Sequence, residues 1–136
     1  MLTKEMLNAR GVGKFPGLLG MVITRVGAME IEAELAVRAE LMAPNGFMHA
    51  GSIVTLADTS CGYGCFANLP QGAAGFTTVE LKSNHLGTTA EGTIAVLAKA
   101  VHLGRSTQVW DAVVTHRESS RTLALFRCTQ MILYPK

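Results

Sequence analysis

Apolar and polar residues alternate with a period of two over several long stretches of the chain, and this pattern predicts β-strands. In the clearest case, residues 29–39, four apolar side chains fall on one face and mostly acidic side chains on the other. A strand of this kind buries one face in a core and exposes the other. Strands are predicted at about 20–26, 29–39, 75–86, 91–103, 106–117 and 121–133.

Turn signals separate these stretches. Gly87, Gly104-Arg105 and Glu118-Ser-Ser120 are each expected to close a short hairpin, so the long strands should pair antiparallel. At the start of the chain, residues 3–10 predict a short helix. A connector rich in Gly and Pro, Gly11 to Gly20, should follow it.

One stretch instead has the three-and-four spacing of a helix, from about Ala50 to Ala67. Most residues on its apolar face are small, so a flat sheet can approach it closely. That face holds Ile53, Leu56, Ala57, Ser60, Cys61 and Gly64. The element order predicts an α+β fold, a curved antiparallel sheet wrapped around one long central helix. We expect a single domain, 1–136, in which 1–19 form the N-terminal helix and connector.

Asp58 lies in this helix, on a different side from the apolar face. Burying an unpaired ionised carboxylate is expensive, and no Lys or Arg occurs between residues 39 and 81 to pair with it locally. Asp58 is therefore a candidate catalytic group. The alternative is a buried structural acid that is hydrogen-bonded to the backbone, to Thr55 or to Thr59.

Composition narrows the function classes. The chain has 136 residues, of which 49% are hydrophobic and 16% charged, which favours a folded domain that oligomerises. The net charge of +2 gives no reason to expect binding to nucleic acid or to a membrane. We expect no signal sequence at the start, and three cysteines suit a reducing cytoplasm better than a disulfide framework.

With these residues described, the chain resembles the hotdog-fold acyl-CoA thioesterases of the phenylacetate-degradation (PaaI-like) type. The similarity in element order and spacing covers roughly residues 20–133. Three segments carry it: Asn45-Gly-Phe-Met-His49-Ala-Gly51-Ser-Ile-Val-Thr-Leu-Ala-Asp58-Thr59, Gly75-Phe-Thr-Thr-Val-Glu-Leu-Lys82 and Val101-His-Leu-Gly-Arg105-Ser106. The first segment is the most specific, because the helix-start His, the Gly and the acid nine residues after the His occur together.

The resemblance implies a dimer whose two sheets join, and often a pair of such dimers. It places the active site at the dimer interface, where the acid of one subunit faces the helix start of the other. The nucleotide of CoA lies over the surface and the pantetheine arm enters through a tunnel. No metal and no bound cofactor are implied, because CoA is part of the substrate.

The chemistry of thioester hydrolysis and the resemblance together give catalytic roles. From the chemistry, we expect Asp58 to act as a general base on water or as a nucleophile, and His49 to orient the substrate or the water. Ala50 replaces the first Gly of the His-Gly-Gly pattern, and its backbone N–H binds the thioester oxygen. Asn45 is the remaining candidate, although relatives often carry this Asn six residues before the His, where this chain has Ala43.

Five residues are assigned to substrate binding, and three of them also have simpler explanations. Thr78 suits a strand in any case, while Arg105 and Ser106 suit a solvated hairpin turn. Arg105 is expected to hold a phosphate of CoA, since a guanidinium matches phosphate well. The five residues are Gly51, Thr59, Thr78, Arg105 and Ser106.

The chemistry is also reasonable without the resemblance. Thioester hydrolysis develops negative charge on the carbonyl oxygen, and a helix N-terminus offers free N–H groups and a partial positive charge to stabilise it. We therefore expect a thioesterase for a small or medium acyl-CoA, with aryl acyl groups among the alternatives. The rival hypotheses are a non-catalytic acyl-CoA binding or sensing protein and a hydratase. Cys61 and Cys65 are interpreted as packing residues and not as metal ligands.

Overall fold

A computed structural model describes residues 1–136 and contains three α-helices, one 3-10 turn and six strands. The helices are α1 (Lys4–Gly11), α2 (Phe15–Leu19) and α3 (Ala50–Ala67), and the 3-10 turn η1 is Ala39–Leu41. The strands are β1 (Val22–Val26), β2 (Glu30–Ala36), β3 (Gly75–His85), β4 (Thr93–Leu103), β5 (Thr107–His116) and β6 (Thr122–Leu133).

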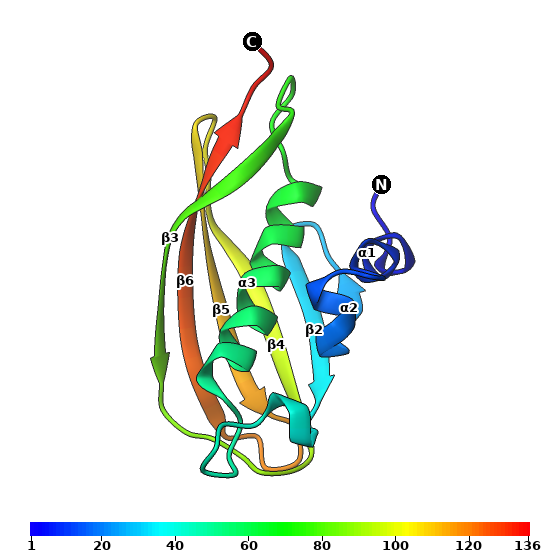
Figure 1. Cartoon of the computed structure of the whole chain (residues 1–136). Coiled ribbons are helices and arrows are strands. Elements are labelled where there is room, and N and C mark those ends of the chain that lie inside the picture. The colour runs from blue at the N-terminus through cyan, green and yellow to red at the C-terminus, as the bar shows by residue number, and fades with distance from the viewer.

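All six strands form one antiparallel sheet in the order β1-β2-β4-β5-β6-β3. The sheet curves around α3, while α1 and α2 lie beside α3 at the β1–β2 end (Figure 1). This confirms the predicted α+β architecture, and α3 has the predicted bounds. None of the helices combines the length and the apolarity needed to cross a bilayer.

The expected hairpin at Gly87 is wrong. β3 pairs with β6 at the edge of the sheet, and the chain after β3 crosses over to β4 near the centre. The burial patterns explain this order: β4 buries Ile94, Val96 and Ala98 beneath α3, whereas most of β3 is exposed. The strand with the apolar face therefore takes the central position. The other two expected hairpins, β4–β5 and β5–β6, are confirmed.

The predicted connector Gly11–Gly20 contains the short helix α2, which periodicity missed. Five residues are too few to show a helical repeat. The helix is marked instead by Pro16 in its first turn and by Gly20, whose φ of 83° ends it. The predicted N-terminal helix is confirmed as α1, where the Thr3 hydroxyl accepts a hydrogen bond from the Met6 N–H at 3.2 Å.

The predicted apolar face of α3 is buried against the sheet. At Gly64 the helix packs directly against the fully buried Trp110 of β5. A Cβ at Gly64 would lie 2.5 Å from two ring carbons of Trp110. The small residues of α3 therefore set how deep the helix lies on the sheet, and with it the position of the neighbouring side that carries Asp58.

We predict that Gly64→Ala destabilises the protein although alanine favours helix. The gain in helix propensity is roughly 1 kcal/mol, whereas overpacking a rigid indole costs about 1–3 kcal/mol. The matched control is Gly62→Ala on the same helix, where the new Cβ would lie 3.3 Å from one ring carbon of Phe76. Urea unfolding should show a lower midpoint for Gly64→Ala than for Gly62→Ala, and equal midpoints would contradict this packing argument.

Candidate active site

The start of α3 presents one free backbone donor. His49 is the N-cap residue, and its Nδ1 accepts a hydrogen bond from the Gly51 N–H at 2.8 Å. The Ala50 N–H has no acceptor in the chain. Ala50 is helical and does not have a positive φ, so replacing the first Gly of the family pattern leaves the backbone donor in place. This N–H and the helix dipole can stabilise an oxyanion.

Gly51 allows the ring of His49 to fold back onto the helix. A Cβ at position 51 would lie 2.9 Å from His49 Nδ1. Since Nδ1 accepts the Gly51 N–H, the neutral ring carries its proton on Nε2. The imidazole therefore presents a donor away from the helix.

A cavity of about 490 Å³ opens beside the helix start. Its walls combine apolar side chains of α2 with residues of η1 and of the first turns of α3. We call it the helix-start cavity. It is lined by Phe15, Leu18, Leu19, Arg38, Glu40, Leu41, His49, Gly51, Ser52 and Thr55.

Asp58 is half-buried, and its Oδ1 is buried without any hydrogen-bond partner. The Thr55 hydroxyl donates to the Gly51 carbonyl at 2.8 Å instead, and Thr59 makes no hydrogen bond to this oxygen. Burial disfavours the charged carboxylate and raises the pKa of Asp58. A carboxylate left unsatisfied in this way is a stronger base than an ordinary Asp, which suits it to proton abstraction.

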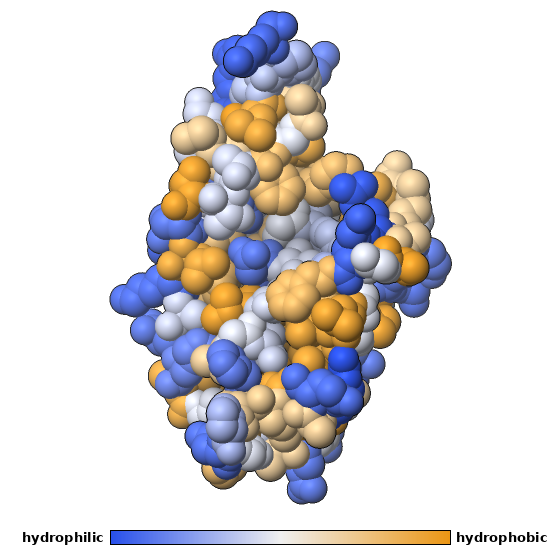
Figure 2. Space-filling view, in the orientation of Figure 1, coloured by the Kyte–Doolittle hydropathy of each residue, from blue (hydrophilic) through white to orange (hydrophobic).

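A second cavity, of about 210 Å³, contains Asp58. We call it the acid cavity, and the hollow between α1 and α3 is visible on the surface (Figure 2). It brings Thr59 and Thr78, two of the residues predicted to bind substrate, together with Asp58. It is lined by Arg10, Asp58, Thr59, Gly62, Tyr63, Phe66, Phe76 and Thr78.

Arg10 is the residue at this cavity that the sequence did not reveal. It comes from α1, and its guanidinium carbon lies 4.2 Å from the centroid of the Phe66 ring. The absence of Lys and Arg between residues 39 and 81 suggested that Asp58 had no cation nearby. No local signal indicates that α1 returns to the far end of α3, because only the tertiary fold brings these segments together.

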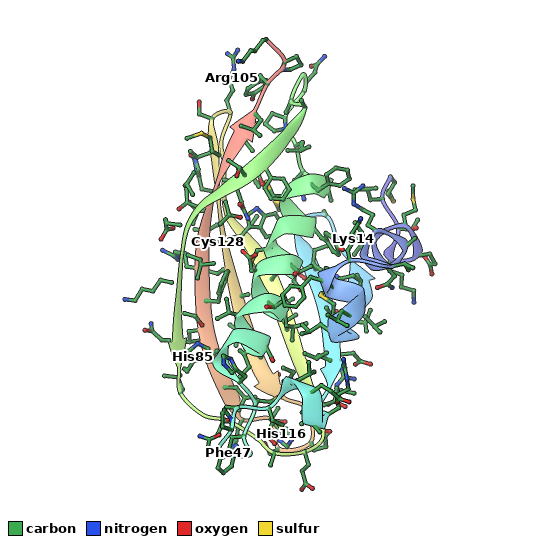
Figure 3. All side chains as sticks on the ribbon, viewed as in Figure 1. Lys14, Phe47, His85, Arg105, His116 and Cys128 are labelled. Carbon is green, nitrogen blue, oxygen red and sulfur yellow. The ribbon has the colours of Figure 1, made fainter.

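Other candidate residues are not brought to the helix start within one chain. Asn45 Oδ1 accepts from the Phe47 N–H at 3.1 Å in its own turn, and Asn45 lines neither cavity. Arg105 and Ser106 are exposed in the β4–β5 turn. Arg105 and Phe47 lie at opposite ends of the molecule (Figure 3).

The cysteines are all buried free thiols, Cys61 and Cys65 on α3 and Cys128 on β6. The Cys61 thiol is hydrogen-bonded with Cys128, which together with burial raises its pKa, and burial raises the pKa of Cys65 to about 12. The Cys61 and Cys65 thiols are therefore protonated near neutral pH, and all three cysteines act as packing groups. No group of three or more His, Cys, Asp or Glu side chains lies close enough to hold a metal ion.

The two cavities share no lining residue, although both lie along α3. Asp58 follows Ala50 by eight residues, or about 12 Å along a helix. The free N–H groups of a first turn also point out of the helix start, away from its middle. Within one chain, the Ala50 N–H and Asp58 therefore lie about 12 Å apart along α3 and face different directions.

The comparisons with known proteins agree on one family. Residues 45–123 match the family described as Thioesterase superfamily. The 1,4-dihydroxy-2-naphthoyl-CoA hydrolase of Escherichia coli K12 is 31% identical over 135 residues, which cover 97% of this chain and 96% of that protein. The proofreading thioesterase EntH of Cronobacter sakazakii is 30% identical, with 97% of this chain and 95% of that protein covered.

The fold is also shared with solved structures. A thioesterase from Haemophilus influenzae superposes with a TM-score of 0.92 at 28% identity, covering 98% of this chain and 92% of that one. A mutant thioesterase from Pseudomonas aeruginosa also has a TM-score of 0.92, at 26% identity, with 98% and 95% of the two chains covered.

The raised pKa of Asp58 predicts how stability depends on pH. Since the folded state holds this proton more tightly than the unfolded state, the stabilisation is complete below the ordinary Asp pKa of about 3.9 and is lost as pH rises through the folded pKa. Asn resembles the protonated carboxyl, so Asp58→Asn should raise Tm at neutral pH, and the gain should disappear toward pH ~4.

Thermal melts across this pH range check the effect. The control is Asp111→Asn, which removes a carboxylate that is ion-paired with Arg127 and should not raise Tm at neutral pH. If Asp58→Asn has a lower Tm than the wild type at neutral pH, Asp58 is a satisfied structural acid.

Proposed function

The chain belongs to the thioesterase superfamily and is a thioester hydrolase, and from this premise we propose that it hydrolyses a small to medium acyl-CoA, with an aryl acyl group, to the free acid and CoA. The observation that carries the proposal is the buried, unpartnered Oδ1 of Asp58 in an aromatic cavity. A protein that only bound acyl-CoA would have no use for a carboxylate kept in this state, so we set that alternative aside.

The lining of the acid cavity supports the aryl group. Tyr63, Phe66 and Phe76 provide three aromatic walls, and about 210 Å³ suits a ring better than a long alkyl chain. Relatives in Escherichia coli and Listeria monocytogenes are named hydrolases of 1,4-dihydroxy-2-naphthoyl-CoA, whose acyl group is also aromatic. A phenylacetyl group also carries an aromatic ring and suits the same cavity. The proposal therefore includes the phenylacetate-degradation (PaaI-like) type of thioesterase.

The proposed reaction uses both halves of the site. The Ala50 N–H and the helix dipole stabilise the charge on the thioester oxygen. Asp58 either removes a proton from the attacking water or attacks the carbonyl carbon itself, and the C–S bond breaks to release CoA. The Nε2–H of His49, beside the helix-start cavity, orients the substrate. No cofactor takes part beyond the CoA of the substrate.

A second copy of the chain completes the site in this proposal. β3 ends the sheet with 11 residues, most of them exposed, and its outer edge has no strand partner. The other edge strand, β1, has only five residues and packs against α1. A long free edge is a template for pairing. Antiparallel β3–β3 pairing inverts the partner, so the helix start of one chain approaches the Asp58 half of the other.

This arrangement makes the protein a homo-oligomer, either a dimer or a dimer of dimers. Three unpaired cysteines suit the reducing cytoplasm as its compartment.

Hybrid dimers test the shared site. Asp58→Asn should lower kcat at least about a hundredfold. Ala50→Pro removes only the free N–H, because proline is tolerated at the first position of a helix. The preceding residue, His49, has φ −64° and ψ 133°, and this extended backbone is compatible with a following proline. It should lower kcat by about 10²–10³, while Ala50→Gly keeps the donor and most of the activity.

Refolding equal amounts of the two inactive chains together gives one intact site in every hybrid dimer. Half of the dimers are hybrids, so about a quarter of the wild-type activity should return. No recovery, with both variants folded and dimeric, would mean that each chain holds a complete site. Near wild-type turnover by Asp58→Asn alone would overturn the catalytic assignment.

Arg105 is proposed to hold a phosphate of CoA. In the proposed antiparallel dimer, the two chains point in opposite directions. Arg105 of one chain then lies at the same end of the dimer as the helix start of the other chain. An exposed contact of this kind is modest and screened by salt. Arg105→Ala should raise KM for acyl-CoA several-fold with little change in kcat, and the effect should vanish with an acyl-pantetheine substrate. Equal impairment with both substrates would exclude the phosphate contact.

A further inference from the structure

A fully buried glutamine lies directly behind the acid cavity. Gln130 is on the inner face of β6, opposite Thr78 of β3 in the sheet register. Thr78 Oγ1 and Gln130 Oε1 are 2.6 Å apart, and Gln130 Nε2 donates to Cys128 Sγ at 3.4 Å. Cys128 is on the same strand (Figure 3).

These contacts fix the direction of the Thr78 hydroxyl. A separation of 2.6 Å is typical of an O–H···O bond and short for N–H···O, so the hydroxyl donates and the Gln130 carbonyl accepts. The amide nitrogen of Gln130 is already directed at the sulfur of Cys128. The single proton of Thr78 is therefore committed to Gln130, away from the acid cavity.

Thr78 then faces the acid cavity only as an acceptor. The ionised carboxylate of Asp58 is also an acceptor, and its Oδ1 has no partner. Two acceptors that line one small cavity cannot bind each other. A water molecule can satisfy both, because it donates one proton to each and keeps a lone pair for attack.

We propose that Gln130 is a positioning residue that keeps the Thr78 hydroxyl turned away from Asp58, so that Thr78 and Asp58 together hold the attacking water. This inference rests on the proposed function and selects the general-base route over the nucleophilic one. The water oxygen bonds to the thioester carbonyl carbon and its proton passes to Asp58. The C–S bond breaks with its electron pair to sulfur, and Asp58 returns the proton to the thiolate.

The other groups around Asp58 do not supply this control. Burial raises the pKa of Tyr63 on α3. The hydrogen bond to Cys128, together with burial, raises the pKa of Cys61 on the same helix. Both groups are therefore neutral when Asp58 ionises. Arg10 of α1 is exposed and lies over Phe66. On β3, Glu80 is bound to the Thr129 hydroxyl, and Lys82 borders a different surface hollow with Asp111 and Arg127. Asp58 is therefore the only carboxylate of the acid cavity whose ionisation the pH profile can follow.

The test is Gln130→Met, which keeps the volume and removes the acceptor. The freed Thr78 hydroxyl can then donate to Asp58, which stabilises the ionised form and weakens the base. We expect the acid limb of the kcat–pH profile to move about 0.5–1 unit to lower pH and kcat to fall about tenfold. The double variant Thr78→Val/Gln130→Met, with no hydroxyl to donate, should lose turnover without this shift.

The matched control is Gln108→Met on β5. Gln108 is also fully buried, but its amide binds Trp110 Nε1 and the Asn68 carbonyl and does not contact Thr78. It should leave the acid limb where it is in the wild type. If Gln130→Met does not fold, Thr78→Val and Thr78→Ser provide the test, because serine keeps the hydroxyl and should retain more turnover.

An unmoved acid limb in folded Gln130→Met, or the same shift in the double variant, would overturn this role of Gln130. Equal turnover of Thr78→Val and Thr78→Ser would do the same. A failure of the proposed function is distinguishable, since it would appear as near wild-type activity of Asp58→Asn, whatever Gln130→Met does.

Discussion

The close packing of α3 on the sheet is the constraint on which the rest of this structure depends. At Gly64 the helix backbone comes so near the buried indole of Trp110 that no Cβ fits between them. Because protein interiors are packed almost as densely as crystals, this contact fixes both the depth and the rotation of the helix. The rotation directs Asp58 to the side of the helix, into a hollow whose other walls come from α1 and from the edge strand β3. A helix held further from the sheet would expose this carboxylate and lose the burial that raises its pKa.

The same geometry is the reason for proposing that two chains share each site. The helix offers its oxyanion donor at one end and its base near the middle, about 12 Å apart and directed differently. Long helices separate such groups by nature, and no side-chain rotation can close the distance. In the proposed dimer, the free β3 edges of two chains pair across a two-fold axis. The helix start of each chain then lies near Asp58 of the other. Folding, assembly and catalysis would then depend on one another.

The hydrogen bonds of two buried glutamines organise the side chains behind the acid cavity. The inner face of the sheet carries two fully buried glutamines, Gln108 and Gln130, and each has specific partners. Buried amides that are satisfied in this way rigidify the surrounding side chains, because breaking any one bond leaves an unpaired group in a low-dielectric interior. The contact from Gln130 to Thr78 extends this rigidity to the surface of the cavity. Asp58 Oδ1 lies outside the network and stays unsatisfied.

The sequence by itself determined the elements with strong local periodicity: the bounds of α3, its small buried face and the six strands within a few residues. It also singled out Asp58 and the helix start, because a lone acid in an apolar helix is visible in a short window of residues. Only the tertiary structure decided that β3 lies at the edge beside β6, that Arg10 reaches the acid cavity and that Gln130 orients Thr78. These contacts join residues about 50 positions apart, so they depend on how elements pack and leave no local pattern. Periodicity records which side of an element is buried, whereas the identity of the neighbour is set by packing of the whole chain.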